Sequence, residues 1–447
     1  MPARGDSWYD VVGIGFGPAN IALAIALEEL WPQARVKFLE KESGPCWQPA
    51  MLLDGADIQN NPVRDLVTPR NPRSRYTFVN YLHENGRLFR YLNLPDHYPL
   101  RKEYARYVQW VANHVPADVD YAMEVAAVRL TGPDGGHPAV EVETAGGELI
   151  RAGAVVIATG RSAYVPPVFA GLVGPDVLHS STYLDGIAGL PADHDGTLAV
   201  VGASQSSIEI VLDLAARFPR AKIVNIMTAF GYRLKDTSPF SEEVYFPEFV
   251  DYYFHASPAG KDRLRTQLRP TNYSSADRDV IDRLYSLMYE DELDGRNRVT
   301  MRTNQYIDGA WRSSGPVTIS MTEQITGERE RITADRVVLA TGYRDLGGHD
   351  RAERVPALLA GLAGVLRIDD ELGLSVGLDY RVGTEPGVPP IYVNGLCETS
   401  HGLGDAGSFS LLALRSKAIT ESLHVALATA GRNGAPGHAA LAGKEAS

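Results

Sequence analysis

Three glycines near the start of the chain form the first pattern that could do chemistry. Gly13, Gly15 and Gly17 separate a short apolar run from an apolar helical pattern over 21–30. Glycine allows a tight turn and lets a pyrophosphate approach the backbone, and the following helix offers free N–H groups to the phosphates. Glu40 ends the next apolar run, where a carboxylate binds the ribose of a dinucleotide. This arrangement predicts a dinucleotide site, although Pro18 replaces the third glycine of the usual fingerprint.

A second turn of small residues follows another apolar run, 197–201. Gly202 starts this turn, Ser204 and Ser207 take the places of the other two glycines, and a helical pattern covers 208–218. On its own this turn is a weak signal. Strand, turn and helix follow one another in the same order as at the N-terminus, which favours a second dinucleotide fold.

Two matching segments follow the two turns. Residues 155–160 and 337–343 are β-branched runs that each contain Ala-Thr-Gly. Such endings recur where strands of flavoprotein nucleotide domains turn back toward the cofactor. Two independent strand–turn junctions are the alternative interpretation, but the position of each copy after one of the two turns favours a pair of related domains.

Composition restricts the class of protein. The chain has 447 residues, 44% of them hydrophobic and 22% charged, with a formal net charge of −12. This charge argues against nucleic acid or an anionic membrane as a partner. We find no secretory signal and no apolar run near the ~20 residues of a membrane helix, so we expect a cytoplasmic protein. The two cysteines, Cys46 and Cys397, are too far apart for a redox pair, and we expect no metal site.

These elements predict an α/β fold with two Rossmann-like dinucleotide-binding domains, for FAD and NADP, and a smaller, mostly helical substrate-binding region. The FAD domain is expected to be discontinuous, over 1–165 and 345–430. The NAD(P)H domain is expected over 166–344, with a substrate-covering helical segment at about 236–295. The remaining residues, 431–447, are rich in glycine and alanine and are expected to form a disordered tail.

The turn and several later motifs resemble the microbial flavin-dependent N-hydroxylating monooxygenases, the L-ornithine and L-lysine N-monooxygenases of siderophore pathways. Pro18, a defect in the generic fingerprint, is the usual residue in this family. The further matching segments are 51–56, 65–70, 76–82, 236–240, 271–273, 335–343 and 401–403. The resemblance covers nearly the whole chain in the family's order.

The resemblance implies a reaction in which NAD(P)H reduces FAD, O2 forms a C4a-hydroperoxyflavin, and a neutral side-chain amine takes the distal oxygen. It implies catalytic roles for Gln59 and Asn272. The implied substrate contacts are Arg64, Glu242, Asn272 and Ser410. The implied FAD contacts are Gly13, Gly15, Gly17, Pro18, Asn20, Glu40, Trp47, Gln59 and Asp405. The implied NADP contacts are Gly202, Ser204, Gln205, Ser206, Ser207, Arg233, Thr341 and Tyr343.

The chain departs from the family at four positions that face ligands. Arg64 replaces a lysine that binds the substrate carboxylate, either as conservative drift or as part of a reshaped pocket. Glu242 replaces an asparagine and has two alternative partners, a substrate cation or Arg64 itself. Thr228 stands where an arginine binds the 2′-phosphate in the family, and Arg233 or Lys235 can substitute for it. The segment 401–412 is one residue longer than in the family.

The leading hypothesis is N-hydroxylation of an amino-acid side-chain amine with FAD, NADPH and O2, and L-ornithine is the default substrate. NADH remains possible as coenzyme. Lysine, arginine, aspartate or a diamine is the alternative substrate. Another flavin monooxygenase reaction and an uncoupled NAD(P)H oxidase are the other hypotheses. By resemblance, we also expect a homo-oligomer, either a dimer or a tetramer.

Overall fold

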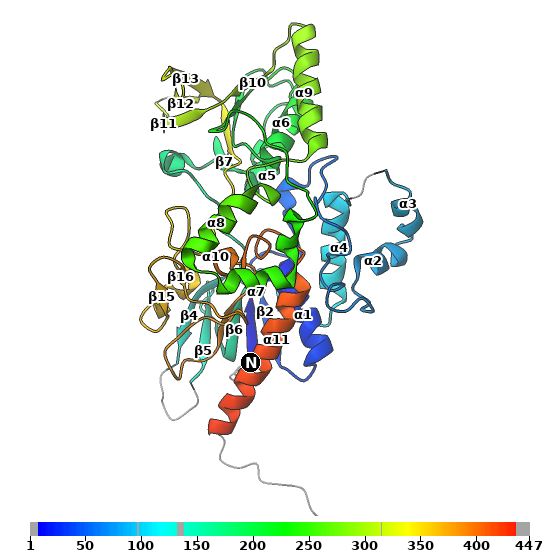
Figure 1. Ribbon diagram of the computed structural model, residues 1–447, viewed down its shortest axis with the longest axis vertical. Helices are drawn as coiled ribbons and strands as arrows, with labels where there is room; N and C mark the ends of the chain where they lie inside the picture. The colour runs from blue at the N-terminus through cyan, green and yellow to red at the C-terminus, as the bar shows by residue number, and fades with distance from the viewer. Residues whose placement is uncertain (1–7, 96–97, 132–137, 314, 435–447) are drawn as a thin grey trace, which may run out of the picture.

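The computed structural model describes residues 8–95, 98–131, 138–313 and 315–434. Two lobes, each built around a parallel sheet, are stacked along the long axis of the molecule (Figure 1). Helices α7 (Pro247–His255) and α8 (Pro258–Leu268) lie between the lobes in this view. The predicted α/β class with two Rossmann-like units and additional helices is confirmed.

The first sheet forms the core of the N-terminal lobe. Its order is β3-β2-β1-β6-β5-β4, and β17 pairs with β6 outside that path. Strand β17 comes from the far end of the chain, so the C-terminal part returns to this lobe, with β17 parallel to β6. The strands are β1 (Trp8–Ile14), β2 (Val36–Leu39), β3 (Asp118–Asp120), β4 (Val125–Leu130), β5 (Val140–Thr144), β6 (Leu149–Ile157) and β17 (Ile391–Val393).

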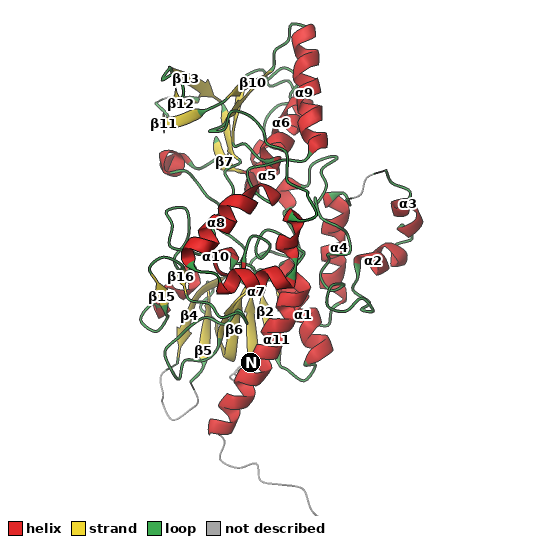
Figure 2. Cartoon of the chain, viewed as in Figure 1, coloured by secondary structure: helices red, strands yellow, loops and turns green. Residues whose placement is uncertain are grey.

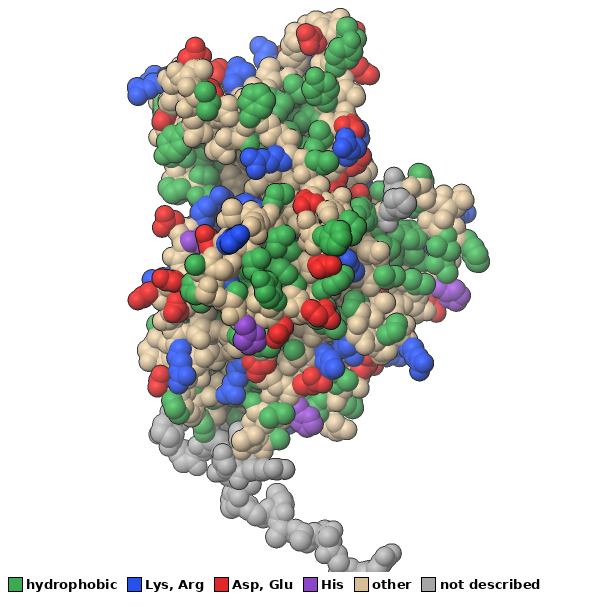
Figure 3. Space-filling model, in the orientation of Figure 1, with side chains coloured by type: hydrophobic (Ala, Val, Ile, Leu, Met, Phe, Trp, Pro, Cys, Tyr) green, Lys and Arg blue, Asp and Glu red, His purple; other side chains and the backbone are tan. Residues whose placement is uncertain are grey.

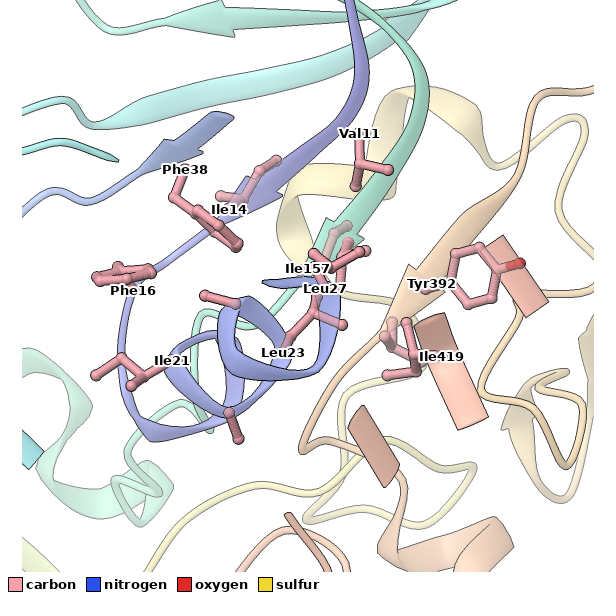
Figure 4. Packing of buried hydrophobic residues seen from close by; sticks show 14 of the residues in the cluster. Val11, Ile14, Phe16, Ile21, Leu23, Leu27, Phe38, Ile157, Tyr392 and Ile419 are labelled. Carbon is pink, nitrogen blue, oxygen red and sulfur yellow. The ribbon is translucent and has the colours of Figure 1, made fainter. Parts of the chain in front are cut away.

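Helix α1 (Pro18–Leu30) is buried between this sheet and α11 (Leu412–Gly434). Every residue from Asn20 to Leu27 is buried, because neighbours cover the helix on all sides. Figure 4 shows how Val11 and Ile14 of β1, Leu23 and Leu27 of α1, Tyr392 of β17 and Ile419 of α11 come together in one apolar core. The first glycine turn is therefore anchored on both of its sides.

The second lobe contains a five-stranded parallel sheet in the order β10-β9-β8-β14-β7. Its strands are β7 (Val177–His179), β8 (Thr197–Val201), β9 (Lys222–Ile226), β10 (Val299–Arg302) and β14 (Arg336–Leu339). Helix α6 (Gln205–Arg217) follows β8, as α1 follows β1. An antiparallel sheet of β11 (Gln305–Trp311), β12 (Val317–Glu323) and β13 (Arg329–Ala334) packs beside it. The pair of β15 (Ile368–Asp369) and β16 (Gly373–Leu374) belongs to the N-terminal lobe, where Leu374 joins the apolar core (Figure 1).

Most of the remaining chain is helical or loop (Figure 2). The N-terminal lobe adds α2 (Phe78–Glu84), α3 (Leu88–Leu92) and α4 (Arg101–His114), and the second lobe adds α5 (Tyr183–Ile187). The predicted helical segment 236–295 contains α7 (Pro247–His255), α8 (Pro258–Leu268) and all of α9 (Arg278–Leu293). The short helix α10 (Glu398–His401) packs against α7.

The C-terminal helix differs from the prediction at one boundary. Helix α11 continues to Gly434, so residues 431–434, which we expected in a disordered tail, are helical. The physical reason is that no proline interrupts the segment before Pro436. The rest of the predicted tail, 435–447, lies outside the described residues. Among the helices of the described ranges, none combines the length and the apolar character needed to cross a bilayer.

Candidate active site

The first glycine turn is fixed by close contact between backbones. Gly15 follows β1 with φ +85°, and a Cβ atom built there would lie 2.5 Å from the carbonyl oxygen of Ala158. Ala158 belongs to the first Ala-Thr-Gly segment, which therefore lies directly against the turn. Gly17 precedes α1, and a Cβ atom there would meet nothing within 4 Å. Gly15 is thus required by the fold, whereas Gly17 leaves space in front of the helix N-terminus.

Polar side chains hold the turn from inside. Asn20 is fully buried and donates a hydrogen bond from Nδ2 to the Gly15 carbonyl at 2.7 Å. Glu40 accepts from Phe16 N at 2.6 Å and from Glu42 N at 2.9 Å, one bond on each carboxylate oxygen. Each oxygen keeps a free lone pair for a ribose hydroxyl. Helix α1 starts with Pro18 and has no side-chain cap, so its first N–H groups are free for phosphate oxygens.

The second turn repeats this construction with other residues. Gly202 follows β8 with φ +155°, and a Cβ atom there would collide with the carbonyl oxygen of Ala340, in the second Ala-Thr-Gly segment. Ser207 donates from Oγ to the Gly202 carbonyl at 2.9 Å, as Asn20 does at the first turn. Ser204 precedes α6 and makes no side-chain cap. Structurally, Gly202 therefore corresponds to Gly15, and Ser204 to Gly17.

A buried ion pair joins the second turn to the N-terminal lobe. Arg101, the first residue of α4, donates to both carboxylate oxygens of Glu209 in α6, at 2.8 and 2.9 Å. The same guanidinium donates to the carbonyl oxygens of Met51 and Asp57. Gln205, predicted at NADP, donates from Nε2 to Glu209 at 3.1 Å. The helix that begins at the second turn is thereby fixed to the segment that carries Gln59.

Gln59 lies in a polar cluster between the lobes. Its backbone has φ +52°, and its N–H donates to the Asp57 carboxylate at 2.9 Å. Lys235 donates from Nζ to the Gln59 carbonyl at 3.3 Å. Gln59 Nε2 and Asp277 Oδ2 are both buried, and neither has a hydrogen-bond partner among the described residues. The Gln59 amide nevertheless lies close enough to the Asp277 carboxylate to oppose the rise in its pKa that burial causes, so the two groups face each other. Such a pair fits a polar ligand that bonds to both groups, such as the nicotinamide half of a dinucleotide.

The carboxylates of this cluster are perturbed by their surroundings. Burial raises the pKa of Asp57 to about 6, with nearby Asp277 and Glu209 adding to the effect. Burial also raises the pKa of Asp277, opposed by the charge of Lys235. Groups with shifted pKa values concentrate at functional sites, which marks this cluster as part of the candidate site.

The predicted substrate residues on the other side of Gln59 contact one another. Arg64 Nη2 lies 3.8 Å from Glu242 Oε2, and both side chains are about one-quarter exposed. The Arg64 guanidinium also lies over the Tyr245 ring, 5.4 Å from its centroid. Asn60 donates to the Arg64 carbonyl and accepts from Ser410 Oγ at 3.3 Å. We expected either a substrate cation or Arg64 as the partner of Glu242, and in this structure Glu242 forms an ion pair with Arg64.

Asn272 lies against the predicted substrate loop. It donates from Nδ2 to the Leu403 carbonyl at 3.3 Å, and a Cβ atom on Gly407 would lie 2.7 Å from this nitrogen. Asp405 is fully buried in an ion pair with Arg415 at 2.8 Å. Burial opposes ionisation, but Arg415 holds the pKa of Asp405 below its usual range. Asp405 thus supports the loop from behind, and its Oδ2 accepts from Cys397 N.

The other residues predicted at FAD or NADP are located by their contacts with neighbouring parts of the protein. Trp47 is partly buried beside Phe409, with ring centroids 5.0 Å apart. Thr341 donates to the Tyr164 carbonyl, and Tyr343 stacks edge-on with His179 at 5.2 Å. Ser206 lies in the first turn of α6. The backbone of Arg233 accepts from Ala276 N, which places it near the start of α9.

Sequence reasoning missed several charged residues of this region. They are Arg101, Glu209, Arg161, Asp277, Glu398 and Arg415, and each is half-buried or buried. The sequence around each of these residues is ordinary. They are recognised only through their contacts with residues that are distant in the sequence. Within the described ranges, no group of three or more histidine, cysteine, aspartate or glutamate side chains is arranged to hold a metal ion.

Comparison with known proteins gives consistent results. The family model of L-lysine 6-monooxygenase/L-ornithine 5-monooxygenase matches residues 7–345. An L-ornithine N(5)-monooxygenase of Burkholderia cepacia is 36% identical over 427 residues, covering 93% of this chain and 94% of the relative. The ornithine hydroxylase PvdA of Pseudomonas aeruginosa has a TM-score of 0.85 at 33% identity, covering 94% of this chain and all of that one.

A further solved structure is the Kutzneria sp. 744 ornithine N-hydroxylase KtzI with reduced FAD, NADP+ and L-ornithine. Its TM-score is 0.85 at 34% identity, and the match covers 94% of this chain and 99% of that one. All of these similarities extend across both lobes and the region between them.

Proposed function

The chain belongs to the L-lysine 6-monooxygenase/L-ornithine 5-monooxygenase family, and we propose that it hydroxylates the side-chain amine of L-ornithine with FAD, NADPH and O2. Membership of this family makes the chain a flavin-dependent N-monooxygenase. One observation carries the proposal for this particular chain. Two equivalent dinucleotide turns belong to two lobes that enclose one polar cluster, around Gln59 and Asp277.

We propose that FAD occupies the first turn, with the predicted FAD-domain limits 1–165 and 345–430. The pyrophosphate would lie in the space in front of Gly17 and the uncapped start of α1. Glu40 would accept a hydrogen bond from the ribose through its free lone pairs. Trp47 and Gln59 would border the rest of the cofactor, and Asp405, which is fully buried against Arg415, would support that wall from behind. FAD supplies the redox chemistry with O2, and the protein supplies binding and orientation.

The second turn, in the predicted domain 166–344, is the proposed NADPH site. Ser204, Ser206 and the start of α6 would hold the pyrophosphate, and Gln205 would fix the helix start, because its amide already bonds to Glu209 and to Asp277 N. Gln59 and Asp277 would bind polar groups of the nicotinamide half. Thr341 and Tyr343, in and just after the second Ala-Thr-Gly segment, would border the nicotinamide half. Arg302, at the end of β10, also lies beside Thr228, because its carbonyl accepts from Met227 N. Its guanidinium, however, is already engaged with Glu330 at 2.8 and 3.0 Å. Arg233 therefore remains our proposed 2′-phosphate contact, and use of NADH is a further possibility to measure.

The substrate would lie between Arg64, Glu242, Asn272 and Ser410, under the helical segment 236–295. Arg64 would bind the α-carboxylate, with Glu242 at 3.8 Å fixing the orientation of the guanidinium. The side-chain amine must lose its proton before it can act as a nucleophile. Enclosure of the amine by the bound cofactors and the helical segment would favour the neutral form, since burial disfavours the charged form.

A second candidate is the same reaction on a different amine. The Arg64–Glu242 pair favours this candidate, because either partner can also bind a substrate group of opposite charge. A lysine, arginine, aspartate or diamine substrate would change which of the two side chains contacts the ligand. An uncoupled NAD(P)H oxidase is the outcome in which no amine is hydroxylated.

One assay separates these functions. NADPH or NADH oxidation is measured with L-ornithine, L-lysine, L-arginine, L-aspartate and a diamine, while hydroxylamine product and H2O2 are quantified together. We expect hydroxylamine with L-ornithine in near-equal amount to the NADPH oxidised. Peroxide with every amine and hydroxylamine with none would refute the proposal.

Variants of the ion pair sharpen the substrate assignment. Arg64→Ala should raise the KM for L-ornithine about 10- to 100-fold, since a charge-assisted hydrogen bond contributes roughly 1.5–3 kcal/mol. Its bound FAD content should stay unchanged. Glu242→Gln should raise the KM less than Arg64→Ala if Glu242 only orients Arg64. An equal or larger effect of Glu242→Gln would instead favour direct binding of a substrate cation.

We also propose that the chain forms a homo-oligomer. Hydrophobic side chains gather across the middle of one face, around α7 (Figure 3), and Phe240 and Tyr252 are 85% and 63% exposed. On α9, Tyr285, Tyr289 and Leu293 are exposed at intervals of four residues and share one side of the helix. Light scattering after gel filtration should give a mass of two or four chains, and a monomer would contradict this.

A further inference from the structure

A buried charged cluster lies where the chain crosses between the two lobes. Arg161 follows the first Ala-Thr-Gly segment, and Asp345 follows the second. Arg161 donates from Nη1 to Asp345 Oδ1 at 3.0 Å and to the Tyr273 hydroxyl at 2.8 Å. The same nitrogen lies 3.8 Å from Glu398 Oε1, at the start of α10. Glu398 is 6% exposed.

The two crossovers also pair with each other through their backbones. Ala163 and Tyr343 form an antiparallel bridge. Tyr164 N donates to the Gly342 carbonyl at 2.9 Å, and Arg344 N donates to the Ser162 carbonyl at 2.8 Å. The crossovers therefore behave as one short ribbon, and the Arg161–Asp345 pair adds a side-chain connection across it.

Glu398 connects this ribbon to the candidate substrate loop. Its Oε1 accepts a hydrogen bond from Gly407 N at 3.1 Å and another from the Tyr273 hydroxyl. Tyr273 is the neighbour of Asn272 in the chain. A Cβ atom on Gly407 would lie 2.7 Å from both Asn272 Nδ2 and the Tyr273 hydroxyl, so these groups are already in close contact. One carboxylate oxygen thus connects the Gly407 loop to Tyr273, which lies 125 residues before Glu398 in the sequence.

The loop has further direct contacts, from Asn272 Nδ2 to the Leu403 carbonyl and from Arg415 to Asp405. Asp405 and Arg415 support the loop from the opposite side, and they already satisfy each other. Thr399, next to Glu398, donates to the Leu346 carbonyl and so fixes α10 to the chain after the second crossover. The position of the Glu398 side chain is therefore fixed in two ways, by the anchoring of α10 and by the hydrogen bonds of the carboxylate itself.

We propose that Glu398 is a positioning residue, which fixes Asn272 and the 402–410 loop relative to the crossovers and so determines how efficiently NADPH oxidation is coupled to hydroxylation. This inference rests on the proposed N-hydroxylation. The loop and Asn272 would enclose the substrate, and any looseness there admits water and lets peroxide form instead of hydroxylated amine.

The charge state of Glu398 gives the proposal a distinctive signature. Burial raises the pKa of Glu398 to about 8, and the nearby Asp345 adds to this, whereas Arg161 opposes it. Burial keeps the pKa of Tyr273 well above its usual value, so Tyr273 stays a donor. The other titratable groups that face the carboxylate are Asp405, Tyr245 and Tyr253. As the pH rises through about 8, Glu398 ionises, and hydrogen bonds to a charged acceptor are stronger.

The test compares Glu398→Gln, Glu398→Ala and Tyr273→Phe in the FAD-loaded enzyme. Glu28→Gln is a matched control, because Glu28 accepts from Tyr76 at 2.7 Å and from Arg75 at 2.8 Å but lies on α1, away from the crossovers. Hydroxylamine per NADPH and H2O2 are measured from pH 6.5 to 9. Hydrogen–deuterium exchange of peptides covering 402–410 and 160–164 is measured at pH 7.

We expect Glu398→Ala to lower the coupling about 3- to 10-fold and to raise exchange in the 402–410 loop. Glu398→Gln should stay within about 2-fold of the wild type at pH 7, because it keeps a neutral acceptor. It should lack the gain in coupling that the wild type shows above pH 8. Tyr273→Phe should give an intermediate loss, and Glu28→Gln should change neither readout.

Two results would overturn the proposal. One is wild-type coupling and wild-type loop exchange in Tyr273→Phe. The other is a pH profile of Glu398→Gln that coincides with that of the wild type. If the wild type produces no hydroxylamine from any amine, the proposed function fails instead. Loop exchange then still tests the role of Glu398, because it requires no turnover. A failure of Glu398→Ala to fold leaves the other two variants decisive.

Discussion

The two dinucleotide turns share their backbone contacts and differ in their side chains. At each turn, the residue after the first strand is a glycine packed on the alanine of an Ala-Thr-Gly segment: Gly15 on Ala158 and Gly202 on Ala340. At each turn, a side chain five residues later binds the carbonyl of that glycine, Asn20 at 2.7 Å and Ser207 at 2.9 Å. Yet the first turn has three glycines and the second has one.

The difference shows which glycine the fold requires. Among the glycines of the two turns, only the one that contacts an Ala-Thr-Gly segment would place a Cβ atom in collision with neighbouring backbone. The position before the helix is open in the first turn, and Ser204 occupies it in the second. We infer that the additional openness at Gly17 serves a ligand, whereas the second turn accepts a side chain at the same place. Variants at these matched positions test this comparison.

The largest effect is expected from Gly15→Ala. Its Cβ atom would lie 2.5 Å from the Ala158 carbonyl oxygen, at a φ of +85° that alanine rarely adopts. We expect a loss of about 3 kcal/mol or more in the free energy of unfolding. Chemical denaturation and bound flavin content measure this. A variant that keeps full stability and full flavin would show that the close contact does not define the turn.

Gly202→Ala should give a more localised effect. The new Cβ atom would meet the Ala340 carbonyl, in the lobe proposed to bind NADPH. We expect FAD content to stay near that of the wild type, while the Kd for NADPH rises more than 10-fold. Flavin absorbance and anaerobic reduction by NADPH provide the two readouts. Loss of FAD at normal NADPH affinity would reverse our assignment of the two turns.

Asn20→Ala and Ser207→Ala compare the two internal hydrogen bonds. Asn20 is fully buried and also accepts from Asn394 at 3.2 Å, so its loss leaves Asn394 Nδ2 with one partner fewer. We expect a cost of about 2 kcal/mol for Asn20→Ala. Ser207 is equally buried, and its Oγ also bonds to Tyr232 and Asn225. Ser207→Ala should nevertheless cost only about 1 kcal/mol, because Asn225 also donates to the Gly202 carbonyl at 3.0 Å. Equal costs in thermal or chemical unfolding would mean that the two turns are not held differently.

The smallest effect on stability is expected from Gly17→Ala. Nothing lies within 4 Å of the new Cβ atom, and the backbone at φ −80° suits alanine. The free energy of unfolding of the apoprotein should therefore change by less than about 1 kcal/mol. The affinity for FAD should nevertheless fall, because the Cβ atom enters the space proposed for the pyrophosphate. Unchanged FAD affinity, measured by flavin titration, would contradict that placement.

Much of this comparison could be predicted from the sequence. Both turns, both Ala-Thr-Gly segments and the α/β class follow from local patterns of glycine, small residues and apolar runs. The equivalence of residues between the turns could not. Counting from the first glycine pairs Gly202 with Gly13, whereas the contacts in the structure pair Gly202 with Gly15. The sequence pattern does not indicate which glycine will contact a strand more than 130 residues away.

The charged residues of the site were less predictable for the same reason. Arg101 and Glu209 are 108 residues apart, and Arg161 and Asp345 are 184 residues apart. Their pairing depends on how the lobes meet, which leaves no periodic or local signal in the sequence. The Arg64–Glu242 pair was among the expected alternatives only because family resemblance placed both side chains at the substrate.

A single-turnover experiment tests the central claim most directly. The FAD-loaded enzyme is reduced anaerobically with one equivalent of NADPH and then mixed with O2 and L-ornithine. We predict close to one equivalent of N5-hydroxylated ornithine per flavin, with little H2O2. One equivalent of H2O2 and no hydroxylated amine, from L-ornithine or any other amine tested, would contradict the account.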